Sequence, residues 1–281
     1  MRMLNLKLII TLSFLLVSIF CEAQYYNPLL KKYADSLRYG KNADYRKLFN
    51  DSFKAEIKSE LEKDNAFNYN FDSINQVVSI LKSKDQKFRV ISWVYINDKE
   101  EYTNHCIVQY KKKPSSETTT YWLNDFTNNK ADSIYDECTT SDWVGALYYQ
   151  MSQSRKSGID YYIVLGLDGL TSFSNRKIID AFWIDKQGEL HIGAPLFYDN
   201  DKDYTPRYRV FLNYADATSI VLRFESVKKM ITFSNLTPSN PSATGSRQYY
   251  IPDGRIDYYL LTKKGKWIKH EGLQEFDLLT N

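Results

Sequence analysis

The sequence has few of the residues that build metal centres and nucleophilic active sites. Its 281 residues include only three histidines and three cysteines. His105, His191 and His270 are isolated from one another, and neither an H-x-x-x-H nor a C-x-x-C spacing occurs. The G-x-S-x-G, P-loop and G-x-G-x-x-G motifs are also missing. The sequence therefore predicts no metal ion and no cofactor, and it nominates no catalytic residue.

An excess of charge of one sign is missing as well. The chain has 37 Lys and Arg against 34 Asp and Glu, which is a formal net charge of +3. Nucleic-acid binding needs a strong basic excess on one face. The basic cluster Lys111–Lys113 stands alone and is typical of a solvated turn. We therefore expect no nucleic-acid partner.

Long apolar runs are confined to the N-terminus. Leu8–Phe20 is an apolar stretch of 13 residues, shorter than the roughly 20 residues that cross a bilayer core. Two basic residues precede it, and Cys21 and Ala23 are the small residues that signal peptidase reads. The pattern predicts a signal peptide over residues 1–23, export to the periplasm or the cell exterior, and no transmembrane segment after cleavage. An uncleaved anchor or a buried N-terminal helix is the alternative.

A lipoprotein signal is the second alternative, and it would anchor the chain through an acylated Cys21. The residue before this cysteine is Phe20. Lipoprotein signals prefer a small residue there, so the sequence favours cleavage before Gln24.

Aromatic side chains are what the chain has in quantity. They make up 15% of the residues and include 23 tyrosines, whereas the chain has 11 glycines and 7 prolines. Aromatic residues favour pleated, half-buried surfaces, which indicates β structure. In a strand, one member of an adjacent pair points inward and the other outward, and the outward rings either cover the sheet or bind a carbohydrate or a protein. The adjacent pairs are Tyr148-Tyr149, Tyr161-Tyr162, Tyr249-Tyr250 and Tyr258-Tyr259.

The first part of the mature chain has helical periodicity. Residues 28–39 begin with a proline, repeat apolar residues at three-to-four spacing and end before Gly40. Residues 44–62 have one apolar stripe and a charged opposite face. A third helix is predicted from Asp72 or Ser73 to about residue 82, where Ile74, Val77, Val78 and Leu81 would be buried.

After Lys87 the pattern changes to short β-branched and aromatic runs separated by turn residues. The turns include Asp168-Gly169, Gln187-Gly188 and Asp253-Gly254. Short strands joined by tight turns are typical of an antiparallel meander. The strand candidates are 88–96, 102–110, 118–123, 143–151, 161–165, 178–184, 208–214, 219–224, 230–233, 257–261 and 266–270.

The change from helical periodicity to short β runs predicts an α+β fold. A helical segment over residues 24–85 packs on a mostly antiparallel β-rich domain over residues 86–281, which is sandwich-like or rolled. The alternative is a small β-propeller, because residues 178–191 and 256–270 both consist of a strand, a glycine turn and a short strand.

Several segments along the chain are distinctive in their order. They are 71–74, 85–93, 146–149, 162–169, 176–181, 209–214, 231–236, 252–254 and 265–267. Together they resemble an uncharacterised family of exported proteins common in Bacteroidetes, over roughly residues 45–270. The resemblance implies export and no particular activity. Leu167 departs from the pattern, since an aromatic residue is expected there in the Leu-Gly-x-Asp-Gly motif.

Two cysteines remain in the mature chain, Cys106 and Cys138. In an oxidising compartment two cysteines can pair, and a disulfide closing this loop would stabilise the fold by about 3–4 kcal/mol. Two separate buried thiols are the alternative.

A polar cluster is the one candidate site that the sequence offers. Asp168 is followed by Ser174, Asn175 and Asp180, which could meet at one edge of a sheet. The alternative is that Asp168-Gly169 is only a turn. The function that these features favour is a non-catalytic binding or envelope-associated structural module with an unidentified ligand, carbohydrate or protein. A secreted or periplasmic hydrolase acting on polysaccharide or envelope polymers is the competing hypothesis.

Overall fold

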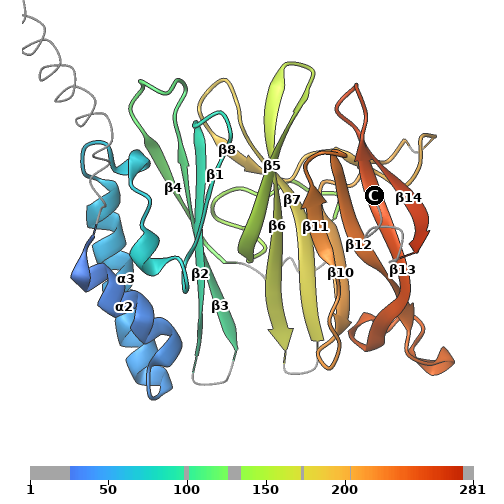
Figure 1. Ribbon diagram of the computed structural model, residues 1–281, viewed down its shortest axis with the longest axis horizontal. Helices are drawn as coiled ribbons and strands as arrows, with labels where there is room; N and C mark the ends of the chain where they lie inside the picture. The colour runs from blue at the N-terminus through green and yellow to red at the C-terminus, as the bar shows by residue number, and fades with distance from the viewer. Residues whose placement is uncertain (1–25, 98–100, 126–133, 172–173, 203, 275–281) are drawn as a thin grey trace, which may run out of the picture.

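The structure is a computed structural model, and it describes residues 26–97, 101–125, 134–171, 174–202 and 204–274. The predicted signal peptide and Cys21 lie outside these residues. Figure 1 shows two helices and three β-sheets that follow one another along the long axis of the molecule. This is the predicted α+β architecture, with helices at the N-terminal end and mostly antiparallel sheets behind them. Within the described ranges no helix is long and apolar enough to cross a membrane.

The two N-terminal helices are those that the periodicity predicts. Helix α2 spans Pro28–Tyr39 and α3 spans Ala43–Leu61. Asn27 caps α2 by accepting hydrogen bonds from two backbone amides of its first turn, and Asn42 caps α3 in the same way through one amide. Their apolar faces pack on the neighbouring sheet and on each other, as short helices require in water.

The third predicted helix is wrong. Asp72–Ile74 forms a single 3-10 turn, and the chain then enters strand β1, Ser79–Lys82, which pairs with β2. The apolar residues of this segment fit a helical period, but the strand itself contains Ile80, whose branched side chain favours strands. Pairing with β2 therefore overrides the helical pattern, and a strand lies inside the segment that was expected to be helical.

The first sheet has the order β1-β2-β3-β4 and is antiparallel throughout. Two of its strands lie where the sequence predicts them, at residues 88–96 and 102–110. Ile91 and Trp93 face the helices, whereas Val90 on the alternate face contacts the next sheet. The remaining strands of this sheet are β2 (Phe88–Ile96), β3 (Tyr102–Tyr110) and β4 (Thr119–Leu123).

The central sheet has the order β10-β7-β6-β5, with β8 also paired to β7. The third sheet has the order β11-β12-β13-β14-β9, in which only the β14–β9 pair is parallel. The central strands are β5 (Leu147–Lys156), β6 (Ile159–Thr171), β7 (Ser174–Ile184), β8 (Leu190–Ile192) and β10 (Val210–Ala215). Those of the third sheet are β9 (Phe197–Tyr198), β11 (Leu222–Glu225), β12 (Met230–Pro238), β13 (Tyr250–Leu261) and β14 (Trp267–Gln274).

Three apolar cores separate the layers. One lies between the helices and the first sheet, one between the first and central sheets, and one between the central and third sheets. None of these clusters, which are made of described residues, joins the first sheet to the third. The sheets are therefore stacked in a row, as Figure 1 shows, and the propeller alternative is wrong. The two similar segments are ordinary hairpins, β7–β8 and β13–β14.

Two predicted turns lie inside strands. Asp168-Gly169 belongs to β6, next to an irregularity in its pairing with β7, and Asp253-Gly254 belongs to β13, where its register against β12 shifts. Gly254 has a φ of 88°, the left-handed conformation that glycine adopts without strain. Asp-Gly therefore marks an irregular strand here and not the end of one.

The glycines of the Leu-Gly-x-Asp-Gly motif allow close packing. A Cβ atom at Gly166 would lie 2.9 Å from the Cβ of Ala146 and 2.9 Å from Cδ1 of Tyr148, two residues with no exposed surface. At Gly169 it would lie 2.5 Å from Cδ2 of Tyr102, whose side chain is 44% exposed. Gly166 thus allows close packing of β6 on β5 within the central sheet, whereas Gly169 allows the central sheet to approach β3 of the first sheet.

Gly166→Ala is expected to lower the free energy of unfolding by about 1–3 kcal/mol, because its neighbours are buried and cannot move aside. Gly169→Ala is the matched control, and its loss should be smaller because the half-exposed ring of Tyr102 can rotate away. Urea denaturation of both variants measures the difference. Equal losses would show that the burial of the neighbours does not set the cost.

Candidate functional site

The structure does not bring the predicted polar cluster together. Asp168 and Ser174 lie near one end of the β6–β7 hairpin, and Asp180 lies six residues further along β7, which is roughly 20 Å at about 3.3 Å per residue. Asn175 points to the opposite face of β7 from Ser174 and donates a hydrogen bond to Asp216. The alternation of side chains along the strand therefore separates residues that are close in sequence.

Asp168 is buried, with 1% of its surface exposed. Its Oδ1 accepts a hydrogen bond from Nδ2 of Asn104 at 3.1 Å, while Oδ2 has no hydrogen-bond partner among the residues that the structure describes. Burial raises the pKa of this carboxyl to about 7, although the positive charge of Arg176 opposes the shift. A carboxyl closed off from solvent in this way joins two sheets and is not placed to meet a ligand.

Asp180 is fully buried as well, and it forms an ion pair with Arg209 at 3.3 Å in which neither side chain is exposed. Arg209 also donates hydrogen bonds to the backbone carbonyls of Asp136 and Ile192. Burial raises the pKa of Asp180 despite the neighbouring guanidinium. This pair fastens the segment around residues 136–138 to the central sheet, which is a structural role.

The predicted disulfide is not formed in the structure. Cys106 and Cys138 are both buried thiols, and both pack in the core between the first and central sheets. Cys106 lies opposite Ser92 and Leu123 in the sheet, so its side chain fills apolar space there. Burial raises the pKa of the Cys106 thiol well above its ordinary value, which keeps it protonated and unreactive.

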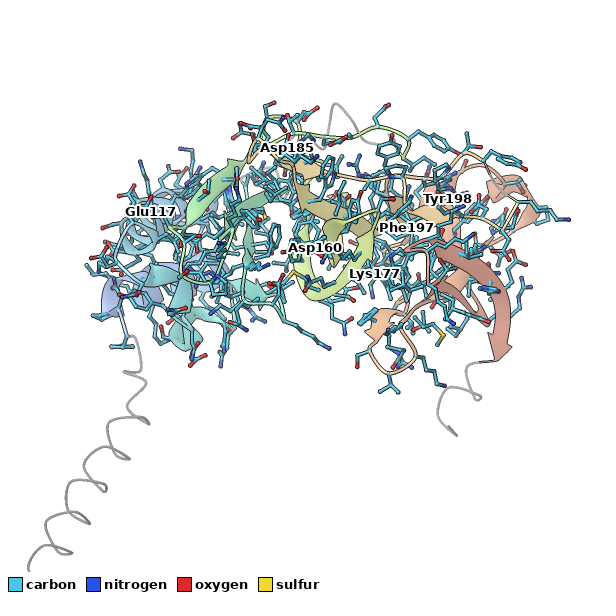
Figure 2. The ribbon with its side chains drawn as sticks, turned by 90° about the horizontal axis from the view of Figure 1, so that it is seen from above. Glu117, Asp160, Lys177, Asp185, Phe197 and Tyr198 are labelled. Atoms are coloured by element: carbon cyan, nitrogen blue, oxygen red, sulfur yellow. The ribbon has the colours of Figure 1, made fainter. Side chains whose placement is uncertain are left out.

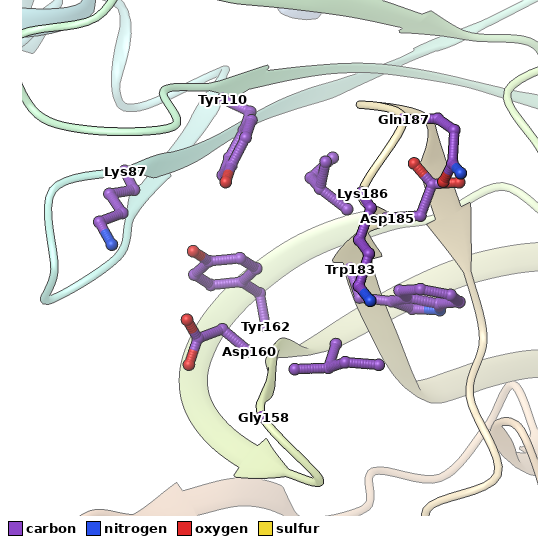
Figure 3. A pocket seen from close by; sticks show the side chains of 11 residues that line it. Lys87, Tyr110, Gly158, Asp160, Tyr162, Trp183, Asp185, Lys186 and Gln187 are labelled. Atoms are coloured by element: carbon purple, nitrogen blue, oxygen red, sulfur yellow. The ribbon is translucent and has the colours of Figure 1, made fainter.

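The best candidate for a binding site is a cavity of about 440 Å³ between the first and central sheets. Figure 3 shows Lys87 and Tyr110 of the first sheet on one side of the cavity. Residues at the start of β6 and at the end of β7 in the central sheet, such as Asp160 and Trp183, lie on the other side. Viewed from above in Figure 2, Asp160 and Asp185 lie between Glu117 on one side of the molecule and Tyr198 on the other. The volume of the cavity falls within the range of small-molecule pockets.

Aromatic rings held by fixed contacts line this cavity. Tyr162 stacks on Phe88 with ring centroids 4.0 Å apart, and its hydroxyl donates to Oδ2 of Asp85 at 3.2 Å. Trp183 stacks on His191 at 4.2 Å, and its indole nitrogen donates to the carbonyl of Gly193 at 3.3 Å. Both rings are thus fixed before any ligand arrives.

The acid nearest to Trp183 is fully engaged. Oδ1 of Asp185 accepts a hydrogen bond from the backbone amide of Glu189 at 2.8 Å, and Oδ2 lies 3.1 Å from Nε2 of His191. The other ring nitrogen of His191 contacts Glu137. The amide of Glu189 lowers the pKa of Asp185, and His191 adds to this effect. These contacts hold the turn after β7 in place and keep this carboxylate ionised.

Other polar groups of the cavity are unengaged, which means that they make no hydrogen bond or ion pair within the described ranges. They are the ammonium groups of Lys87 and Lys186, the hydroxyl of Tyr110 and the side-chain amide of Gln187. Asp160 faces Arg155 across the β5–β6 pair at 3.7 Å. The cavity therefore combines fixed aromatic rings with donors and acceptors that are available to a ligand.

Among the described residues, no group of three or more His, Cys, Asp or Glu side chains is arranged to hold a metal ion. Comparison of the chain with known protein families, with curated proteins and with solved structures finds no match. The likeness to exported Bacteroidetes proteins stays a prediction.

Sequence reasoning missed this cavity, although two of its signals were visible. The alternation of side chains predicts one inward and one outward ring at Tyr161-Tyr162, but both rings are buried because the central sheet is covered on both faces. At Tyr148-Tyr149 the predicted alternation holds, with Tyr148 buried and Tyr149 37% exposed. Gln187-Gly188 predicts a turn, and Gln187 also lines the cavity.

Proposed function

We propose that this chain is an exported, non-catalytic module that binds a carbohydrate in the cavity between its first and central sheets. The observation that carries the proposal is the combination of two partly exposed rings, Tyr110 and Trp183, with unengaged donors and acceptors around one pocket. Sugars present apolar C–H faces that pack on aromatic rings, and hydroxyl groups that need hydrogen-bond partners. Export is supported by the N-terminal pattern of residues 1–23 alone.

The charged groups of the cavity argue against glycoside hydrolysis. That reaction pairs an ionised carboxylate with a carboxylic acid whose pKa is raised. In Asp185 the pKa is lowered, and both carboxylate oxygens are already in contact with Glu189 and His191. In the part of the chain that the structure describes, the acids with raised pKa values are Asp168 and Asp180, and both are buried outside the cavity. These contacts support binding over the competing hydrolase.

Binding is tested with protein purified after expression of the full chain, by electrophoresis in gels that contain neutral or acidic polysaccharides. We expect retardation by at least one polysaccharide. Trp183→Ala should weaken binding about tenfold, because it removes a ring from the cavity. Tyr110→Phe should weaken it about two- to tenfold, because it removes one unengaged hydroxyl.

The control is Tyr249→Ala, which removes an exposed tyrosine outside the cavity and should leave retardation unchanged. Thermal melts of each variant separate lost binding from lost folding. The proposal is abandoned if no polysaccharide retards the wild type, or if folded Trp183→Ala migrates as the wild type does.

A further inference from the structure

We infer that the cavity selects acidic carbohydrates, in which sugar units carry carboxylate groups. This inference rests on the proposed function and concerns the ligand of the same cavity. Four charged side chains line the pocket: Lys87, Asp160, Asp185 and Lys186.

The two acids of the cavity already have partners within the protein. Asp185 accepts a hydrogen bond from a backbone amide and contacts the ring of His191. Asp160 lies beside the guanidinium of Arg155, with Oδ1 and Nη1 3.7 Å apart. Both carboxylates are therefore in contact with groups of the protein before a ligand enters the pocket.

The two lysines lack such neighbours. Over the described residues, neither Lys87 nor Lys186 has an acidic side chain within ion-pair distance or a hydrogen bond to its ammonium group. Lys87 is partly buried, so its attraction to an anion is screened less than that of an ammonium group in open water, whereas Lys186 is exposed and attracts an anion more weakly. The charged groups of the cavity that have no partner are thus the two ammonium groups. An anionic ligand can pair with them.

The lysines come from different layers. Lys87 precedes β2 in the first sheet, whereas Lys186 lies in the turn after β7 of the central sheet, and Figure 3 shows both beside the same cavity. The apolar residues Ile159 and Ile184 line the same cavity. Two ammonium groups from different sheets beside one apolar surface offer two contacts to a polymer whose sugar rings carry carboxylates.

The experiment compares each acidic polymer with its own neutral form. Oligosaccharides of polygalacturonate, alginate and hyaluronate are titrated by calorimetry into the protein purified after full-chain expression, and so are the carboxyl-reduced forms of the same chains. We expect at least one acid form to bind about tenfold more tightly than its reduced form, and that preference to shrink as salt is added. Dextran sulfate is the third arm, and equal or tighter binding of this polymer would show a general preference for polyanions and overturn the inference.

The variants assign the preference to the cavity. Lys87→Gln/Lys186→Gln should bind the acid and reduced forms equally. Lys32→Gln/Lys41→Gln removes the same charge from two exposed lysines on the helical side, and it should keep the wild-type preference. Loss of the preference in both double variants would mean that overall charge, and not the cavity, attracts the acid.

The two proposals fail in different ways. If acid and reduced forms bind equally to the wild type while Trp183→Ala loses both, carbohydrate binding stands and the acid preference is wrong. If these uronate chains do not bind but a neutral polysaccharide does, the acid preference is also wrong. If nothing binds, the proposed function fails together with the inference.

Discussion

Arg209→Met is expected to lower the free energy of unfolding by about 3–5 kcal/mol. Removing one partner of a buried ion pair leaves the other charge without compensation in a medium of low dielectric. In this protein the stranded group is Asp180, which has no exposed surface. The substitution also removes the donors to the carbonyls of Asp136 and Ile192. Guanidinium denaturation, followed by tryptophan fluorescence, measures the loss.

Arg207→Met is the matched control, because this arginine is partly exposed and pairs with Asp199 at the surface. Exposed ion pairs contribute between about 0 and 1 kcal/mol, so the control should stay within that range. The double variant Asp180→Leu/Arg209→Met adds a second comparison. It should be more stable than Arg209→Met alone, because no buried charge is left unpaired. A double variant less stable than Arg209→Met would show that the stranded carboxylate is not the source of the loss.

The sequence predicted the elements that carry a strong local signal. Helix α2 has a cap at Asn27, a proline at its start and an apolar stripe, so its bounds follow from its own residues. Strand β2 is rich in β-branched and aromatic residues, because both of its faces are covered. Strand β9 is only two residues long, and no period can be recognised over so short a stretch.

The errors have one physical origin, which is that neighbouring layers override local preference. The segment after Ile74 has a helical period, but the exposed edge of β2 supplies hydrogen bonds that a strand can take. Asp168-Gly169 is a favourable turn pair, but it continues β6 because Asn104 and Tyr102 of the first sheet pack against it. Asn104 and Tyr102 are both more than 60 residues away from Asp168-Gly169 in the sequence, so local preference cannot reveal this contact.

The candidate cavity could not have been predicted for the same reason. Lys87 and Tyr110 belong to the first sheet, while Trp183 and Gln187 belong to the end of the β7–β8 hairpin. They meet because the two sheets pack face to face through a shared apolar core, in which Phe88 stacks on Tyr162. No spacing in the sequence encodes that contact, and each of these residues taken singly resembles an ordinary surface side chain.

The second large effect concerns pH, and it is expected at Asp168. Its pKa in the folded protein is raised to about 7 by burial, against about 3.9 for an aspartate in an unfolded chain. Below about pH 4 both states hold the proton, and the carboxyl does not favour either of them. Between about pH 4 and pH 7 the unfolded chain releases the proton while the folded protein keeps it, so the folded state loses stability as pH rises.

Asp168→Asn should remove this loss. The amide is neutral at every pH, and its oxygen can still accept the hydrogen bond from Asn104. At pH 8 the variant should therefore be more stable than the wild type, by at most about 4 kcal/mol for a shift of this size. At pH 4 the two proteins should be nearly equal. Urea denaturation at intervals from pH 4 to pH 8 gives the difference directly.

Asp185→Asn supplies a control of opposite sign. The backbone amide of Glu189 and the ring of His191 lower the pKa of Asp185, so its contribution to stability is present above about pH 4 and is lost as pH falls through the lowered pKa. Its substitution should therefore destabilise the protein at neutral pH, where substitution of Asp168 stabilises it. Because the other carboxylates are common to wild type and variant, subtracting the two curves isolates each group. An Asp168→Asn curve parallel to that of the wild type would mean that this carboxyl is already ionised in the folded protein, and that Arg176 outweighs its burial.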